Sequence, residues 1–186
     1  MVLVYAGSIY FAFYVGDRQL RIRYFAASFA IWTLNGVVLA ILLASVGPCF
    51  LEPMVGNAHY AEQMAYLGKA NQIYPVLSVD VQQQIIAWYA SGSHDLGRGI
   101  SAMPSMHVAL AFLFFLAIRQ VSRTLGIVFF LFFATILIGS VHLGYHYAVD
   151  GYVSILVTSV VWVICGKLFP PAPRSRDVAN SLVAAA

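Results

Sequence analysis

The sequence predicts an all-α protein, a polytopic bundle of transmembrane helices. Of its 186 residues, 61% are hydrophobic and only 9% are charged, whereas about 25% of the residues in an ordinary soluble domain are charged. The apolar residues form long uninterrupted runs, most of them near the ~20 residues that a helix needs to cross a bilayer. We therefore expect an integral, multi-pass membrane protein.

Five apolar runs are the candidate spans, at residues 1–15, 24–47, 103–118, 124–141 and 147–166. The first run is short and lacks the basic start and cleavage site of a signal peptide, so we interpret it as a trimmed helix and expect a further helix before Met1. In the second run, Thr33 and Asn35 are expected to hydrogen-bond a neighbouring helix. Residues 1–168 are interpreted as a single transmembrane domain and residues 169–186 as a cytoplasmic tail.

The placement of charge predicts the orientation of the spans. Most basic residues fall in segments that five spans would bring to one side of the membrane: Arg18, Arg21, Arg23, Arg119, Arg123, Lys167, Arg174 and Arg176. The positive-inside rule makes that side cytoplasmic. The net charge of +3 is scattered over these short segments without a basic face, so no nucleic-acid partner is expected.

The long outer segment, residues 48–102, is expected to carry helices that lie in the membrane interface. One helix is predicted at about residues 77–89, where apolar residues recur at helical spacing opposite a polar run, Gln82 to Gln84. An earlier helix is predicted at about residues 58–69. Two alternatives stay open for these helices, a surface helix packed on the bundle and a lid over a site.

The motif RGISAMPSMHVALAF, residues 98–112, precedes the third span. Pro104 suits the first turn of a helix, which would place Ser105 and His107 at the outer end of that helix. Unpaired backbone N–H groups and the helix dipole favour an anion there. Ser105 can donate a hydrogen bond to a phosphate oxygen, and the ordinary pKa of His107, near 6.5, allows proton transfer near neutrality.

A second motif, GSVHLGYHYAVDGY at residues 139–152, lies at the same predicted membrane face. His146 and Asp150 are four residues apart, so the carboxylate can reach the ring. An Asp that holds one ring nitrogen as N–H leaves the other nitrogen with a lone pair for nucleophilic attack. Ionisable groups in membrane helices are costly, which favours a functional role for this pair.

Other interpretations of the histidines were weighed against a catalytic role. His146 and Asp150 would also suit a polar pair that packs two helices. His142, His146 and His107 would suit a metal or haem site, but no Cys joins them and they lie at one membrane face, so we expect no metal and no cofactor. A non-catalytic scaffold would explain the spans but not the presence of two motifs.

Together, the motifs resemble the second and third signatures of the type 2 phosphatidic acid phosphatase superfamily, Pro-Ser-x-His and His-x-x-x-Asp, which here read PSMH and HYAVD. Their surroundings, and VGPCFLEPMVG at residues 46–56, are most similar to the inositol-phosphotransferase branch, which includes inositol phosphorylceramide synthases. The resemblance covers about residues 46–166. It implies a helical bundle that has six spans in the family.

The resemblance also implies a lipid phosphotransferase or phosphatase that forms a phosphohistidine. His146 would attack phosphorus, Asp150 would orient it and His107 would protonate the leaving alcohol. Ser105 and nearby backbone N–H groups would hold the nonbridging oxygens. His142 is a candidate substrate contact, although an amphipathic ring at the membrane interface is favoured over direct catalysis. A phospholipid would be the donor, a lipid alcohol or water the acceptor, and the site would face the extracytoplasmic side, periplasmic or luminal.

Two phosphate-binding features of the superfamily are missing. Its first signature, Lys followed six residues later by Arg-Pro, has no counterpart, since the only lysines are Lys69 and Lys167. Ser140 stands where the phosphatases carry an Arg six residues before the nucleophile. Arg98 is the best-placed substitute and Lys69 a weaker one. Fewer cations favour a phosphodiester, such as a phosphoinositol headgroup, and leave a lipid or polyprenyl phosphate phosphatase as the alternative.

Overall fold

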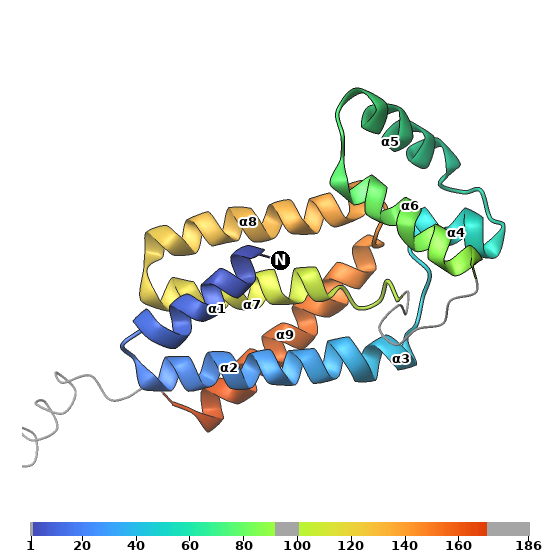
Figure 1. Ribbon diagram of the computed structural model, residues 1–186. Helices are drawn as coiled ribbons and strands as arrows, with labels where there is room; N and C mark the ends of the chain where they lie inside the picture. Colours follow the sequence, from blue (N-terminus) through green and yellow to red (C-terminus); the bar gives the residue numbers. More distant parts are fainter. Residues whose placement is uncertain (1, 92–100, 171–186) are drawn as a thin grey trace, which may run out of the picture.

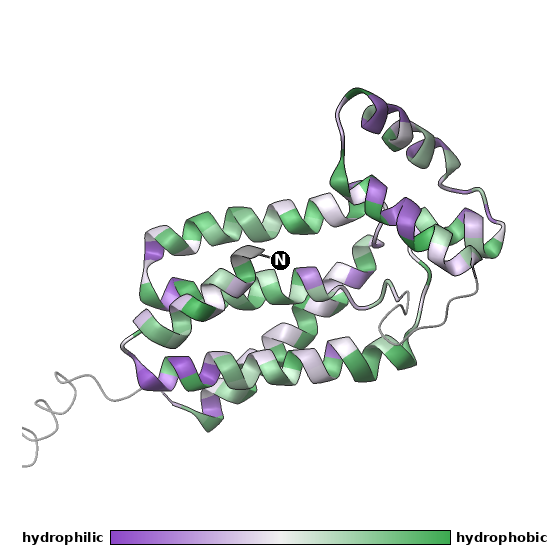
Figure 2. Ribbon diagram, viewed as in Figure 1, coloured by the Kyte–Doolittle hydropathy of each residue, from purple (hydrophilic) through white to green (hydrophobic). Residues whose placement is uncertain are grey.

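The computed structural model describes residues 2–91 and 101–170, and these ranges contain helices and no strand. The predicted all-α class is confirmed for this part of the chain. The longer helices lie side by side in a bundle, and three shorter helices gather beyond one end of it (Figure 1). The bundle helices are mainly hydrophobic along their length, while hydrophilic residues are concentrated near the ends and on the outer helices (Figure 2).

The bundle contains α1 (Val2–Tyr14), α2 (Arg18–Thr33) with its continuations η1 (Leu34–Leu39) and α3 (Ala40–Leu42), α7 (Met106–Val121), α8 (Arg123–His142) and α9 (Ala148–Leu168). The outer helices are α4 (Pro48–Val55), α5 (Ala61–Ile73) and α6 (Leu77–Ala90). The helices predicted in the outer segment correspond to α5 and α6. The third, α4, starts with Pro48 at its first position and ends at Gly56, whose φ of 75° suits a glycine C-cap.

Three helices in the described ranges are long and apolar enough to cross a membrane: Arg18–Leu42, Arg123–His142 and Ala148–Leu168. The predicted spans at residues 103–118 and 1–15 are shorter helices, of 16 residues in α7 and 13 in α1. At 1.5 Å per residue they extend about 24 Å and about 20 Å, less than the ~30 Å of a hydrocarbon core. The expected count of five or six spans is therefore not confirmed.

The central helix of the bundle is α7, which packs against α1, α2, α8 and α9. Its buried side chains run from Val108 to Ile118. Aromatic rings join α1 and α2 to it: the Phe11 ring stacks on Tyr24 with centroids 4.5 Å apart and meets Phe114 edge-on at 5.7 Å. Because α7 packs against four other helices, little of its surface would face lipid. Its length therefore need not match the thickness of the hydrocarbon core.

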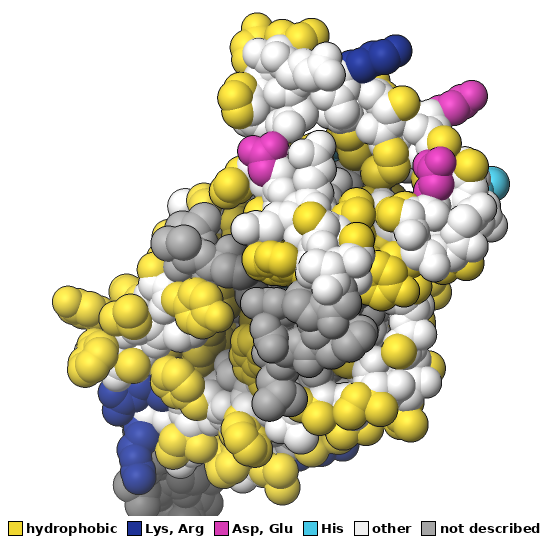
Figure 3. Space-filling view, turned by 45° about the vertical axis from the view of Figure 1, so that its right-hand side comes forward, with side chains coloured by type: hydrophobic (Ala, Val, Ile, Leu, Met, Phe, Trp, Pro, Cys, Tyr) yellow, Lys and Arg dark blue, Asp and Glu magenta, His cyan; other side chains and the backbone are white. Residues whose placement is uncertain are grey.

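The basic residues of the predicted inner segments share one end of the bundle. Arg18 begins α2, Arg119 lies in the last turn of α7, Arg123 begins α8 and Lys167 lies in the last turn of α9. Arg174 and Arg176 lie outside the described residues. On the face shown in Figure 3, Asp and Glu side chains lie over the outer helices, and Lys and Arg side chains gather mainly at the opposite end. The charge pattern thus divides the bundle into a basic end and an outer-helix end.

Arg23 fastens α2 to α9 at the basic end. Its Nε and Nη2 donate hydrogen bonds to the Trp162 carbonyl at 3.2 and 2.8 Å, and its guanidinium lies 3.8 Å from the centre of a Trp162 ring. Gly166 makes room for this contact, since a Cβ there would lie 2.5 Å from Nη2. Arg23 therefore carries a packing role in addition to its charge.

We predict that Arg23→Met lowers the free energy of unfolding by about 1.5 to 3 kcal/mol, because two hydrogen bonds from a charged group are lost. Chemical unfolding in detergent micelles measures the change. Arg18→Met is the matched control: Arg18 is exposed at the start of the same helix, and its loss should change stability by less than about 0.5 kcal/mol. Equal effects of the two substitutions would contradict the packing role.

Candidate active site

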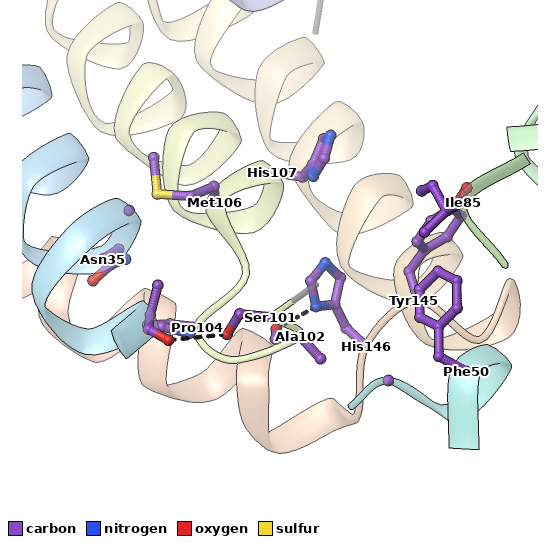
Figure 4. Close-up of a pocket in the computed structure, with 13 residues that line it drawn as sticks. Asn35, Phe50, Ile85, Ser101, Ala102, Pro104, Met106, His107, Tyr145 and His146 are labelled. Carbon is purple, nitrogen blue, oxygen red and sulfur yellow. Dashed lines mark hydrogen bonds between the residues drawn. The ribbon is translucent and has the colours of Figure 1, made fainter. Parts of the chain in front are cut away.

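A cavity of about 370 Å³ lies where the bundle meets the outer helices (Figure 4), within the usual size of a small-molecule site, roughly 300 to 1,000 Å³. Its lining residues come from η1, α3, α4, α6, α7 and the turns beside them: Asn35, Gly36, Ala40, Gly47, Phe50, Ile85, Ser101, Ala102, Pro104, Met106, His107, Tyr145 and His146. The two motifs thus contribute His107 and His146 to one cavity.

His146 lies in the turn between α8 and α9, with its ring oriented by a backbone carbonyl. Its Nδ1 is 2.5 Å from the Ala102 oxygen. A carbonyl can only accept, so this bond places the hydrogen on Nδ1 and leaves a lone pair on Nε2. Burial lowers the pKa of His146 below the ordinary 6.5, and the bond to Ala102 opposes this shift. Burial is the larger of the two effects, so the lowered pKa favours a neutral ring at neutral pH, with the lone pair on Nε2.

Asp150 is buried beside this ring but does not hydrogen-bond it. The distance from its Oδ2 to the His146 Nδ1 is 3.7 Å, beyond hydrogen-bond range. Oδ2 instead accepts from the Tyr147 N–H at 2.8 Å, as part of the cap at the start of α9. The Ala102 carbonyl therefore takes the place expected for the Asp150 carboxylate, and an orienting role of Asp150 stays a prediction.

His107 lies in the first turn of α7 and faces the cavity. Pro104 was expected in that turn but lies before it, because α7 begins at Met106 with Ser105 as its N-cap. Ser105 is fully buried, its Oγ has no hydrogen-bond partner among the described residues, and it is not among the residues that line the cavity. Its N–H donates to the Asp150 carbonyl at 3.4 Å. A role of Ser105 in binding phosphate stays a prediction.

Ser140 contributes to the site through its backbone. Its carbonyl accepts hydrogen bonds from the N–H groups of Tyr145 and His146, at 3.1 and 3.2 Å. Its hydroxyl donates to the Leu137 carbonyl at 2.9 Å and does not line the cavity. Ser140 thus closes the turn that presents the His146 ring.

The remaining predicted residues lie elsewhere. His142 is exposed and lines a separate cavity of about 510 Å³ with Gln63 and Tyr152. Lys69 is exposed on α5, and Arg98 falls outside the described residues. Within residues 2–91 and 101–170, no three His, Cys, Asp or Glu side chains are grouped so that they could hold a metal ion. The structure does not bring together the histidine trio of the metal alternative.

Two hydrogen bonds join α6 to the turn that carries His146. Gln82 is buried and donates to the Leu143 carbonyl at 2.7 Å, and the Tyr145 hydroxyl donates to the Ser78 carbonyl at 2.7 Å. In contrast, the apolar Leu77 side chain is exposed. Val79 is also buried, whereas Gln83 and Gln84 are exposed. A mixed face of α6 therefore contacts the bundle, and this helix supports the site.

The helix α4 supports the same turn from another side. Gly144 has a φ of 73°, and its carbonyl accepts from the Cys49 N–H at 2.8 Å. Gly47 packs directly on the Tyr145 carbonyl: a Cβ on Gly47 would lie 2.3 Å from that oxygen. Glycine is required at Gly47 by close approach and is favoured at Gly144 by conformation.

Asn35 is a cavity residue whose role differs from the expected one. Within the described ranges, neither Thr33 nor Asn35 makes the expected hydrogen bond to a neighbouring helix. Thr33 Oγ1 donates to the Phe29 carbonyl of its own helix at 3.0 Å. Asn35 is fully buried, and both atoms of its amide lack a partner in those ranges. An unpaired buried polar atom costs about 1 to 3 kcal/mol. The sequence signal that could have indicated this role is the presence of a polar residue within an apolar span.

The chain was compared with known families and proteins. The family model described as PAP2 superfamily matches residues 2–164, which include both motifs. No curated protein and no solved structure matches the chain.

We predict that Gly47→Ala destabilises the protein by about 1 to 3 kcal/mol, because the added methyl group forces the turn away from α4. Unfolding in detergent measures the difference. Gly139→Ala is the control, since a Cβ at Gly139 meets nothing within 4 Å, and it should be neutral or stabilising. If the two variants are equally stable, Gly47 does not support the turn.

Proposed function

Because the chain belongs to the PAP2 superfamily, the type 2 phosphatidic acid phosphatases, we propose that it moves a phosphoinositol-type headgroup from a phospholipid to a lipid alcohol. Membership makes it a phosphoric ester hydrolase or phosphotransferase. The observation that carries the proposal is the shared cavity of His107 and His146, with the tautomer of His146 set by Ala102.

In the first step, His146 Nε2 attacks the phosphorus of the donor. A P–N bond forms, the bond between phosphorus and the diacylglycerol oxygen breaks, and the headgroup phosphate stays on the ring as a phosphohistidine. His107, in its protonated form, gives its proton to the leaving alkoxide. The positive charge that develops on the His146 ring is stabilised by the Asp150 carboxylate at 3.7 Å and by the Ala102 carbonyl.

In the second step, His107 is neutral and accepts the proton of an incoming hydroxyl group. The hydroxyl oxygen attacks phosphorus, the P–N bond breaks and His146 returns to its neutral state. A lipid alcohol gives a new phospholipid, and water gives free inositol phosphate. Backbone N–H groups and Ser105 are proposed to hold the nonbridging oxygens during both steps.

The charge of the cavity supports a phosphodiester as the donor. None of its described lining residues is Lys or Arg. A monoester phosphate carries two negative charges and needs more compensating positive charge than a diester. The phosphate of a diester carries one negative charge, both in the donor lipid and in the phosphohistidine. Arg98 is proposed to supply a cation. The described basic residues other than Lys69 lie at the far end of the bundle, which supports a site on the extracytoplasmic side.

The proposal is tested by incubating the detergent-solubilised protein with phosphatidylinositol labelled in the headgroup, with and without an acceptor, either ceramide or a diacylglycerol whose acyl chains differ from those of the donor. We expect a labelled new phospholipid when the acceptor is present, and a loss of at least about a thousandfold in His146→Ala. Free inositol phosphate alone would indicate hydrolysis. Turnover restricted to phosphomonoester lipids would reject the diester donor, and unimpaired His146→Ala would reject the nucleophile.

The pH dependence of kcat/KM tests the state of His146. The reaction needs its neutral form, which protonation removes as the pH falls. Because burial lowers the pKa of His146 below 6.5, we expect the acid limb of the profile, on which protonation of His146 removes activity, to lie below pH 6.5. An acid limb that begins above pH 6.5 would contradict a neutral, buried nucleophile.

A further inference from the structure

Asn35 occupies an unusual position in the helix that contains it. It belongs to η1, a π-helical segment within the 25-residue helix Arg18–Leu42, and lies seven residues before Leu42, about 10 Å along the axis at 1.5 Å per residue. Such π segments often mark functional sites. The side chain is 0% exposed, and neither amide atom has a hydrogen-bond partner in the described ranges.

Asn35 lines the cavity on the side away from the histidines, with its amide buried in the wall. In Figure 4, Asn35, Met106 and Pro104 lie on one side, and Tyr145 lies on the other with His107 and His146 closer to it. A ligand group that contacts Asn35 would therefore lie at a distance from the phosphorus atom that His146 would attack.

The chemistry of the amide restricts what it can bind. Its nitrogen donates and its oxygen accepts. A phosphate oxygen would satisfy the nitrogen and repel the amide oxygen, whereas a hydroxyl group accepts from Nδ2 and donates to Oδ1. The neighbouring lining residues Gly36, Ala40 and Met106 have no polar side chain. The Ser101 hydroxyl beside Ala40 already donates to the Ala40 and Met103 carbonyls, so most hydroxyl groups of a polyol headgroup would stay unsatisfied there.

We propose that Asn35 binds a second hydroxyl group on the lipid alcohol that accepts the headgroup phosphate. The location of Asn35 within a candidate span fits a group on the lipid rather than in the headgroup. The identity of the reacting hydroxyl rests on the proposed function, but the binding of the second hydroxyl requires no turnover and is measured separately.

Two acceptors that differ by one hydroxyl-bearing carbon test the proposal: 1-monooleoylglycerol, with two hydroxyl groups, and 2-hydroxyethyl oleate, with one. Binding is measured by the lipid-induced rise in unfolding temperature of the full chain in detergent. Transfer is measured with labelled phosphatidylinositol. The variants are Asn35→Leu, which keeps the size and removes both polar atoms, and Asn35→Ala as a second substitution in case the first does not fold.

Thr158→Val is the matched control. Thr158 is also 0% exposed with a hydroxyl that lacks a partner among the described residues, but it does not line the cavity. We expect wild type and Thr158→Val to prefer 1-monooleoylglycerol by at least about tenfold, or about 1.4 kcal/mol, and both Asn35 variants to lose that preference.

Two results would overturn the proposal. Equal binding of both lipids to wild type would mean that the Asn35 amide hydrogen-bonds water and not the lipid. A preference that survives in the Asn35 variants would mean that another residue binds the second hydroxyl group. If no lipid is turned over but the binding preference depends on Asn35, the proposed function fails and the binding role stands.

Discussion

The hydrogen bond between the His146 ring and the Ala102 carbonyl joins the two halves of the candidate site, which are 44 residues apart in the chain. It orients the ring, places the hydrogen on Nδ1 and leaves Nε2 free. It also ties the segment before α7, which positions His107, to the turn before α9. The proposed chemistry depends on this one contact, because a rotated or protonated ring would present no lone pair to phosphorus.

The outer helices support that contact. The turn before α9 is held by Cys49 of α4, by Gln82 of α6 and by the bond from Tyr145 to Ser78. The segment before α7 is held in turn by the bond from the Ala102 N–H to the Ser45 carbonyl at 2.8 Å. Of the two alternatives for the outer helices, a packed helix and a lid, the packed helix suits α6 better, because its buried Gln82 donates to the Leu143 carbonyl of the turn.

Much of this arrangement could be predicted from side-chain patterns. Apolar runs predicted the bundle helices, and the spacing of PSMH and HYAVD predicted that His107 and His146 act together. The sequence carries no signal for a backbone acceptor, so the role of the Ala102 carbonyl could not be predicted, and Asp150 was expected to take it. The span count is not confirmed, because hydropathy does not distinguish a helix that faces lipid from one, such as α7, that is buried in protein. Asn35 was visible as a polar residue in a span, but only the fold shows that it faces a cavity.

The absence of Lys and Arg from the described lining of the cavity agrees with the departures from the superfamily pattern. The proposed role of His146 as the carrier of the headgroup phosphate can be tested by mass-spectrometric peptide mapping after a rapid alkaline quench of a single turnover with phosphatidylinositol. We expect a phosphoinositol adduct on His146 that is absent in His146→Gln. An adduct on another residue, or turnover without any adduct, would contradict it.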